Sequence, residues 1–366
     1  MNNKGAYKSQ LLLPILQVLL AAALFGASAP AAKLLLSRVE PVPLASFLYL
    51  GSGLGAFLLL LLRKTRKTWT QAEAPLRLKD LPWLSGAVLA GGVAAPIVFL
   101  FGLKSTPAAT ASLLLNFEAV ATTLIAVLFF RESGGLRTWI AVAVITLASI
   151  LLSLKWGGAW GFSLGALGVL GACVLWGADN NFTRAISGKD PFAIVVIKGL
   201  AAGLFSLVLA LLLRQKLPPF ELIALALAIG SLSYGVSIVL FILAMRNMGA
   251  ARSSALFGTA PFFGMLLSFL LFRETFTWQF AVSALLMVAG AWLLLGERHA
   301  HIHTHGPIVH EHRHRHDDLH HAHSDNESTT GDSHSHLHEH EQVTHSHRHK
   351  PDLHHRHKHG RAGKES

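Results

Sequence analysis

The chain of 366 residues is strongly apolar: 52% of its residues are hydrophobic, 14% are charged, and the mean hydropathy is +0.47. A water-soluble protein could not hide that much apolar surface behind so few charges. The formal charge of +11 comes from the loops of the apolar part, because the segment 298–366 is nearly balanced, so it does not indicate a nucleic-acid partner. The composition excludes a soluble enzyme and predicts a helical protein embedded in a lipid bilayer.

Ten apolar blocks follow one another along the chain, each long enough to cross a bilayer as a helix. They lie at about 11–32, 43–62, 81–101, 108–130, 137–154, 161–181, 191–213, 221–245, 253–272 and 278–296.

The second half of the chain repeats the first. Residues 102–132 align without gaps with residues 244–274, with nine identities that include the closing Arg-Glu of each copy, and 25–33 resembles 176–184. The predicted units are therefore 1–154 and 155–297, followed by a tail at 298–366. Because five is an odd number, the second unit enters the membrane from the opposite side. The predicted fold is all-α, with ten transmembrane helices as two inverted five-helix repeats, which place a substrate site near the midplane and permit alternating access.

The loop charges indicate an orientation. With the N-terminus inside, fourteen Lys/Arg residues face the cytoplasm and seven face outward. Positively charged loops favour the cytoplasmic side, and an even number of spans puts the tail there too.

Glu118 lies near the middle of the apolar run 108–130. A charged group at that depth costs about 3 kcal/mol, so intramembrane acids are retained mainly along substrate or ion pathways. In the functional interpretation the carboxylate faces a cavity and binds a cationic group or a coupling proton. In the alternative it is protonated and bonds a neighbouring helix, with Asn116 or a serine as partner.

Other polar residues within the spans give further candidates. Asp179 and Asn180 follow Trp176 at the end of the sixth span, where they would line the mouth of a pathway or simply reach the membrane interface. Lys198 would pair with Glu118 or Asp179, or extend to the cytoplasmic surface. Tyr234 would contact substrate or serve helix packing. Pro96, Gly258 and Pro261 are predicted hinges, because broken helices free carbonyls that can line a cavity.

All 22 histidines lie between positions 299 and 359, in alternating runs without apolar clusters. This composition predicts a disordered tail. Neutral imidazoles suit zinc, nickel, cobalt or copper. The candidate metal ligands are His301, His303, His305, His312, His314, His316, His336, His338, His340, His345, His347 and His349.

The repeated unit, the Arg-Glu endings at 131–132 and 273–274, LWGADNNFTR at 175–184 and LNFE at 115–118 together resemble EamA-type permeases of the drug/metabolite transporter superfamily. The resemblance covers about residues 10–297. It implies a ten-helix carrier of a bacterial-type inner membrane, often an exporter of metabolites, amino acids or drugs. Many members have a proline directly after the position of Glu118. Here that residue is Ala119, whereas the second copy has Pro261, so we expect the kinked helix to be the ninth rather than the fourth.

The predicted function is gradient-driven export of small metabolites or drugs by alternating access, with the bilayer and a small-molecule substrate as partners. No cofactor is expected to be required. ATP is not the predicted energy source within this chain, because it lacks a GxxxxGK[ST] phosphate loop. The alternative is a divalent-metal exporter, or a metal-gated carrier that uses the tail as a sensor. An intramembrane enzyme is not predicted, because the first 298 residues lack histidine and the spans lack an aspartate pair. The sequence gives no indication of oligomeric state.

Overall fold

The computed structural model describes residues 3–65, 74–130, 135–155, 161–187, 189–248, 250–295, 299–305, 308–315, 333–340 and 343–349. The first half contains α1 (Asn3–Gly26), α2 (Ser28–Leu35), α3 (Pro41–Thr65), η1 (Leu78–Asp80), α4 (Leu81–Ala87), η2 (Val88–Ala94), α5 (Ala95–Ser105), α6 (Ala108–Leu114), α7 (Phe117–Phe130) and α8 (Leu136–Ser153). The second half contains α9 (Leu164–Ala185), α10 (Pro191–Leu212), α11 (Phe220–Gly230), η3 (Ser231–Val236), α12 (Ser237–Met248), α13 (Ala250–Phe257), α14 (Ala260–Phe272) and α15 (Trp278–Leu295). A two-residue pairing of β1 (Leu154–Lys155) with β2 (Gly161–Phe162) connects the halves.

The apolar blocks are helical, as predicted, and each coincides with one helix or an interrupted series of helices. Seven described stretches are long and apolar enough to cross a membrane: Leu12–Leu35, Pro41–Leu62, Leu78–Ser105, Ala108–Phe130, Leu136–Ser153, Pro191–Leu212 and Phe220–Met245. Two shorter apolar helices lie at Ala260–Phe272 and Trp278–Leu294. The structure therefore confirms a helical membrane protein, while ten crossings and the inverted orientation stay predictions.

Both the fourth and the ninth blocks are interrupted, at positions that align within one residue in the sequence repeat. α6 and α7 are separated at Leu115 and Asn116, and α13 and α14 at Gly258 and Thr259. The expectation that the ninth helix rather than the fourth is broken was therefore wrong. No proline causes the first break; instead, the backbone N–H of Asn116 bonds the Leu113 carbonyl at 3.2 Å and its side-chain amide bonds the same oxygen at 2.9 Å. An asparagine can thus compete with the regular helical hydrogen bond.

The third and eighth blocks each contain a π-helical segment, η2 and η3 respectively. A π-turn widens the helix and leaves carbonyls free to bond side chains, which is frequent at functional sites. Pro96 is buried in the first turn of α5, directly after η2. Because proline has no N–H, the regular helical bond cannot form there.

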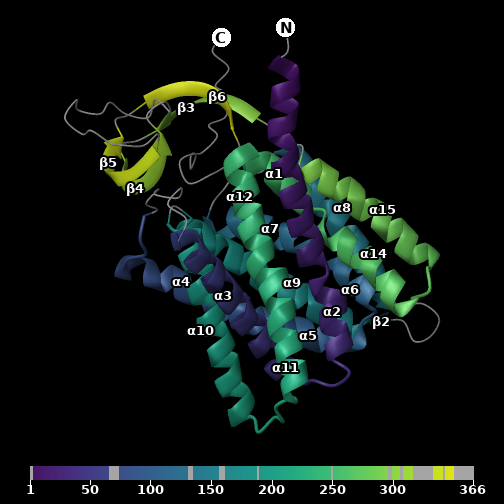
Figure 1. The fold of residues 1–366 in the computed structure, drawn as a ribbon. Coiled ribbons are helices and arrows are strands. Elements are labelled where there is room, and N and C mark those ends of the chain that lie inside the picture. The colour runs from purple at the N-terminus through teal and green to yellow at the C-terminus, as the bar shows by residue number, and fades with distance from the viewer. Residues whose placement is uncertain are drawn as a thin grey trace.

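Equivalent helices of the two halves make equivalent contacts with the other half (Figure 1). α3 packs on α10, α8 on α15 and α6 on α14, while α1 meets α12 and α5 meets α9. Small residues permit the close contact of α3 with α10, where a Cβ added at Gly199 would lie 2.6 Å from the Gly53 nitrogen. Such small residues are typical of helix contacts in membranes, where they let backbones approach one another.

The connection between α5 and α6 is held from two sides. The ammonium of Lys33 donates to the carbonyls of Leu103, Lys104 and Thr106 at 2.5, 3.0 and 2.8 Å. The carboxylate of Glu274 accepts from the backbone N–H groups of the first two residues of α6, at 2.6 and 3.0 Å. The repeated Arg-Glu ending thus supplies a helix cap in the second copy. The first copy of this ending, at 131–132, lies outside the described residues.

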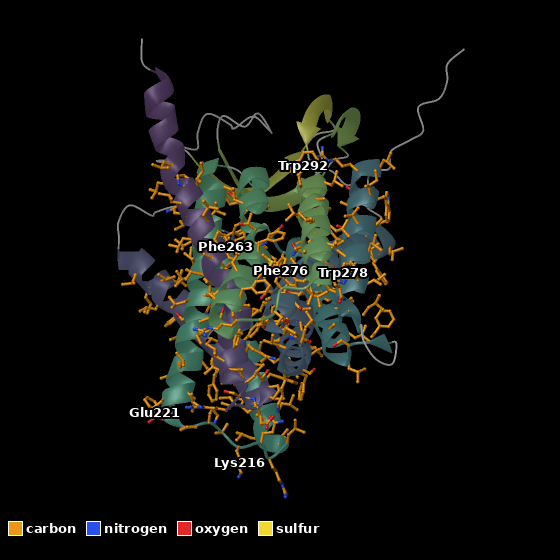
Figure 2. All side chains as sticks on the ribbon, turned by 90° about the vertical axis from the view of Figure 1, so that its right-hand side faces the viewer. Lys216, Glu221, Phe263, Phe276, Trp278 and Trp292 are labelled. Atoms are coloured by element: carbon orange, nitrogen blue, oxygen red, sulfur yellow. The ribbon has the colours of Figure 1, made fainter. Side chains whose placement is uncertain are left out.

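The N-terminal end of α1 and the tail strands lie at the same end of the helical bundle (Figure 1). Figure 2 shows Lys216 and Glu221 at the turn between α10 and α11, at the opposite end from Trp292. The guanidinium of Arg137 lies 4.9 Å from the centre of the Trp292 ring and fixes the C-terminal part of α15.

Four segments of the tail are extended, whereas the sequence predicted disorder for 298–366. β3 (His299–His305) pairs with β6 (Val343–His349), and β4 (Ile308–Arg315) pairs with β5 (Ser333–His340), both antiparallel. The His-X-His sequences have a period of two, which is compatible with the alternation of side chains along a strand. His316, a predicted metal ligand, lies outside the described residues.

Candidate functional site

A cavity of about 550 Å³ lies between the helices of both halves. This volume is typical of sites for small organic molecules. Its lining residues are Phe25, Ser28, Tyr49, Ser52, Phe99, Leu115, Glu118, Trp176, Asp179, Asn180, Thr183, Ile194, Val195, Lys198, Gly199, Tyr234, Ile238, Phe241, Ser254 and Phe257.

The break between α6 and α7 determines the environment of Glu118. Because α7 begins at Phe117, Glu118 lies in its first turn, where the partial positive charge of a helix N-terminus favours a carboxylate. Glu118 Oε1 accepts a hydrogen bond of 2.8 Å from the side-chain amide of Asn180. That amide also donates to the Thr122 hydroxyl at 3.1 Å. Glu118 is half-buried against the cavity, and its side-chain partner is this amide rather than Asn116.

Asp179 of α9 forms an ion pair with Lys198 of α10. The Asp179 side chain is 5% exposed and that of Lys198 is 21% exposed, so the pair is largely shielded from solvent. The second carboxylate oxygen of Asp179 accepts from the Thr183 hydroxyl at 3.0 Å. Gly91 makes room for this carboxylate, since a Cβ there would lie 2.0 Å from an Asp179 oxygen.

The π-helical segment η2 offers one carbonyl to two aromatic residues of the cavity. The Tyr49 hydroxyl donates to the Gly91 carbonyl at 2.7 Å, and the Trp176 indole N–H donates to the same oxygen at 3.1 Å. A carbonyl oxygen has two lone pairs, so both are occupied here. The widened turn thereby fixes the orientation of two large rings in the cavity wall.

Aromatic rings form much of the remaining wall. Tyr49 stacks on Tyr234 with ring centres 5.9 Å apart, and Phe25 meets Tyr234 edge-on at 5.7 Å. On the other side Phe99 packs against Trp176 with ring centres 5.4 Å apart. The cavity therefore combines apolar ring faces with one carboxylate and one ion pair.

The structure brings six of the seven predicted substrate residues together at this cavity: Trp176, Asp179, Asn180, Lys198 and Tyr234 line it beside Glu118. Asn116 does not line it; it is buried at the break and bonds the Leu113 carbonyl. Of the predicted hinges, Gly258 lies between α13 and α14, and Pro261 in the first turn of α14. Asp179 is buried, and its partner is Lys198.

Sequence reasoning did not select Tyr49, Thr122, Thr183 or Phe25. Tyr49 had a detectable signal, because it is one of only three tyrosines in the chain and lies within an apolar span. Buried tyrosine hydroxyls usually need a partner. Within the described residues no group of three or more His, Cys, Asp or Glu side chains is placed to hold a metal ion; the tail side chains are outside that description.

The interrupted helices, the small-residue contacts between halves and the cavity between them define a polytopic membrane protein with an internal binding space. Residues 12–154 and again 163–296 match the EamA-like transporter family, and the chain belongs to this family. EamA proteins form part of the drug/metabolite transporter superfamily, so the chain is a membrane transport protein.

Curated relatives and a solved structure agree with this assignment. An uncharacterized transporter of Methanothermobacter thermautotrophicus is 29% identical over 307 residues, covering 80% of this chain and 88% of the relative. The probable 4-amino-4-deoxy-L-arabinose-phosphoundecaprenol flippase subunit ArnE of Yersinia pestis is 33% identical over 91 residues, covering 25% of this chain and 79% of the relative. A protein of known crystal structure aligns with a TM-score of 0.53 and 18% identity over 78% of this chain and 95% of its own. At that identity it supports the fold alone.

Proposed function

We propose that the chain is a gradient-driven exporter of small amphipathic molecules that carry a positively charged nitrogen. The observation that carries this proposal is the position of Glu118 on an aromatic-walled cavity with a neutral amide as its partner. A carboxylate at that depth gains most when a cation replaces the lost water. Ring faces attract cations as well, and they accept the apolar remainder of the molecule.

The ion pair of Asp179 with Lys198 leaves Glu118 as the carboxylate available to cargo or to a coupling proton. A cavity with this donor set favours an organic cation over a divalent metal. The sequence has no histidine before position 299, and one of the two cavity carboxylates already has a cationic partner. We therefore prefer metabolite or drug export to divalent-metal export, and we assign any metal to the tail.

The position of the lining residues supports export as the proposed direction of transport. Thr183, Ile194 and Val195 belong to the end of α9 and the start of α10, which is the end of the bundle opposite the α10–α11 turn. With the N-terminus and the tail in the cytoplasm, as the loop charges predict, the cavity extends toward the cytoplasmic side. This geometry suits a carrier of the inner membrane that collects cargo from inside the cell.

The proposed mechanism is alternating access by two inverted five-helix halves. Two observations support this mechanism. The helices of the two halves contact one another reciprocally, and the interruption of the third block matches that of the eighth, as the interruption of the fourth matches that of the ninth. In such carriers one half rocks against the other around a fixed site. Pro96, Gly258 and Pro261 would then be the places where helices bend.

The test uses the full chain in proteoliposomes with phenyltrimethylammonium, a permanently charged aromatic cation, under an imposed pH gradient. We expect saturable transport of this probe and much weaker transport of phenylacetate, which has the opposite charge. Glu118→Gln keeps the acceptor for Asn180 but removes the charge, and we expect at least a tenfold loss of transport. Glu221→Gln, at the exposed turn, is the matched control and should transport normally.

Two results would overturn the proposal. Equal transport of both probes would remove the assigned charge preference. An unchanged rate and pH dependence in Glu118→Gln would remove the role of Glu118. The metal-gated alternative predicts that deletion of 299–366 abolishes an effect of zinc on transport of the same probe, whereas the preferred function predicts transport without the tail.

A further inference from the structure

The two strand pairs of the tail collect histidines on one face each. In the first strand pair, three histidines of β3 lie directly opposite histidines of β6. The pairs are His299 with His349, His301 with His347, and His303 with His345. His305 continues the same face opposite Val343, so that eight positions of this face hold seven histidines.

The second pair repeats the arrangement. His310, His312 and His314 lie opposite His338, His336 and His334, respectively. His340 lies opposite Ile308 on the same face, which again holds seven histidines in eight positions. Fourteen of the 22 histidines of the chain are therefore concentrated on two faces.

The register itself creates these faces. Residues directly opposite each other in an antiparallel pair share a face, and a slip by one residue would move every side chain of one strand to the other face. After such a slip His301 would stand opposite Ser346 or Arg348 instead of His347. The observed pairing thus aligns imidazole positions that a disordered tail would not keep together.

Paired histidine positions have the spacing that a metal ion requires. Directly opposite residues have Cβ atoms about 4.5–5.5 Å apart, and successive positions on one face lie about 7 Å apart along the strand. Imidazole nitrogens bind Zn²⁺ at about 2.0–2.1 Å in a tetrahedral set of four. Two consecutive cross-strand pairs therefore place four histidine positions at a spacing that suits one such site.

We propose that each strand pair is a binding site for a divalent ion of the zinc and nickel class, formed by two consecutive cross-strand histidine pairs. In the first site the pairs are His301 with His347 and His303 with His345. In the second they are His310 with His338 and His312 with His336. The proposal does not depend on the transported substrate. In the first site the bound metal ion would hold together two segments that are about 40 residues apart in the sequence.

Metal stoichiometry tests the proposal in the full chain. Zn²⁺ is titrated by calorimetry at pH 7.5, and bound metal is counted by elemental analysis after dialysis. We expect two tightly bound ions per chain, with X-ray absorption showing about four nitrogen ligands. His301→Gln/His303→Gln and His310→Gln/His312→Gln should each lose one ion.

The matched control, His320→Gln/His321→Gln, replaces two histidines that belong to neither proposed site, and it should keep both ions. Equal losses in all three variants would mean nonspecific chelation by a histidine-rich segment and would overturn the proposal. So would the binding of no tight ion by the unaltered chain.

Crosslinking tests the register independently. On the face opposite the histidines, Ile302 stands directly across from Ser346. In a Cys173→Ser background, Ile302→Cys/Ser346→Cys should form a disulfide at least ten times faster with Zn²⁺ than without it. Ala300→Cys/Thr344→Cys, offset by four residues, should not respond, because a disulfide needs Cα atoms within about 7 Å. Equal zinc-dependent rates in both variants would refute the predicted pairing.

Discussion

Removal of the ammonium of Lys198 should destabilise the protein more than removal of its partner charge. In Lys198→Met the carboxylate of Asp179, with a side chain 5% exposed, keeps only the Thr183 hydroxyl as an observed partner. Loss of one member of a buried ion pair typically costs about 3–5 kcal/mol, because the other charge stays without compensation. In Asp179→Asn the remaining ammonium is 21% exposed and can reach water, so we expect a smaller loss of about 1–2 kcal/mol.

The assay is a double-mutant cycle on the free energy of unfolding in mixed micelles. Asp179→Asn/Lys198→Met should be more stable than the sum of the single losses predicts, by about 2 kcal/mol, because it leaves no uncompensated charge. Additive losses, with a coupling below about 0.5 kcal/mol, would show that the pair is effectively solvated and would refute the reasoning from burial.

Two further stability predictions have matched controls in the chain. Glu274→Gln should lower the free energy of unfolding by about 1–2 kcal/mol, because one of the two α6 N–H groups loses its charged acceptor; Glu221→Gln, at the exposed turn, should change it by less than about 0.5 kcal/mol in the same micelle assay. Gly199→Ala should cost about 1–3 kcal/mol, because the new Cβ would lie 2.6 Å from the Gly53 nitrogen, whereas Gly171→Ala has its nearest neighbour at 3.7 Å and should stabilise α9 by about 0.5–1 kcal/mol. Equal effects of the two alanine substitutions would contradict the packing of α3 on α10.

The sequence located the helices well because their signal is local: long apolar blocks separated by polar loops. The sequence also indicated Glu118, Trp176 and Lys198. Polar or large amphipathic side chains within an apolar block are energetically costly in a bilayer on whichever face of the helix they lie, so they stand out in the sequence. It could not decide whether Lys198 pairs with Glu118 or with Asp179. That choice depends on the rotation of α10 against α9, which no local pattern records.

The helix break at Asn116 and the role of Tyr49 could not be predicted from local sequence patterns, for a related reason. Helix breaks are normally recognised by proline or glycine, but here a side-chain amide replaces the helical hydrogen bond. Tyr49 finds its partner in a carbonyl that is free only because η2 is π-helical. The sequence around Gly91 does not distinguish this geometry from a regular helix. The break also explains how Glu118 comes to lie in the first turn of α7.

The shared carbonyl of Gly91 has a consequence for what the cavity can hold. Because Tyr49 and Trp176 occupy both of its lone pairs, this carbonyl offers no acceptor to an entering molecule. A hydroxyl group placed against this part of the wall would exchange its hydration for contact with ring faces, at about 1–3 kcal/mol for each group left unpaired. The backbone feature that widens the helix thus makes this part of the cavity wall a poor contact for uncharged hydroxyl groups.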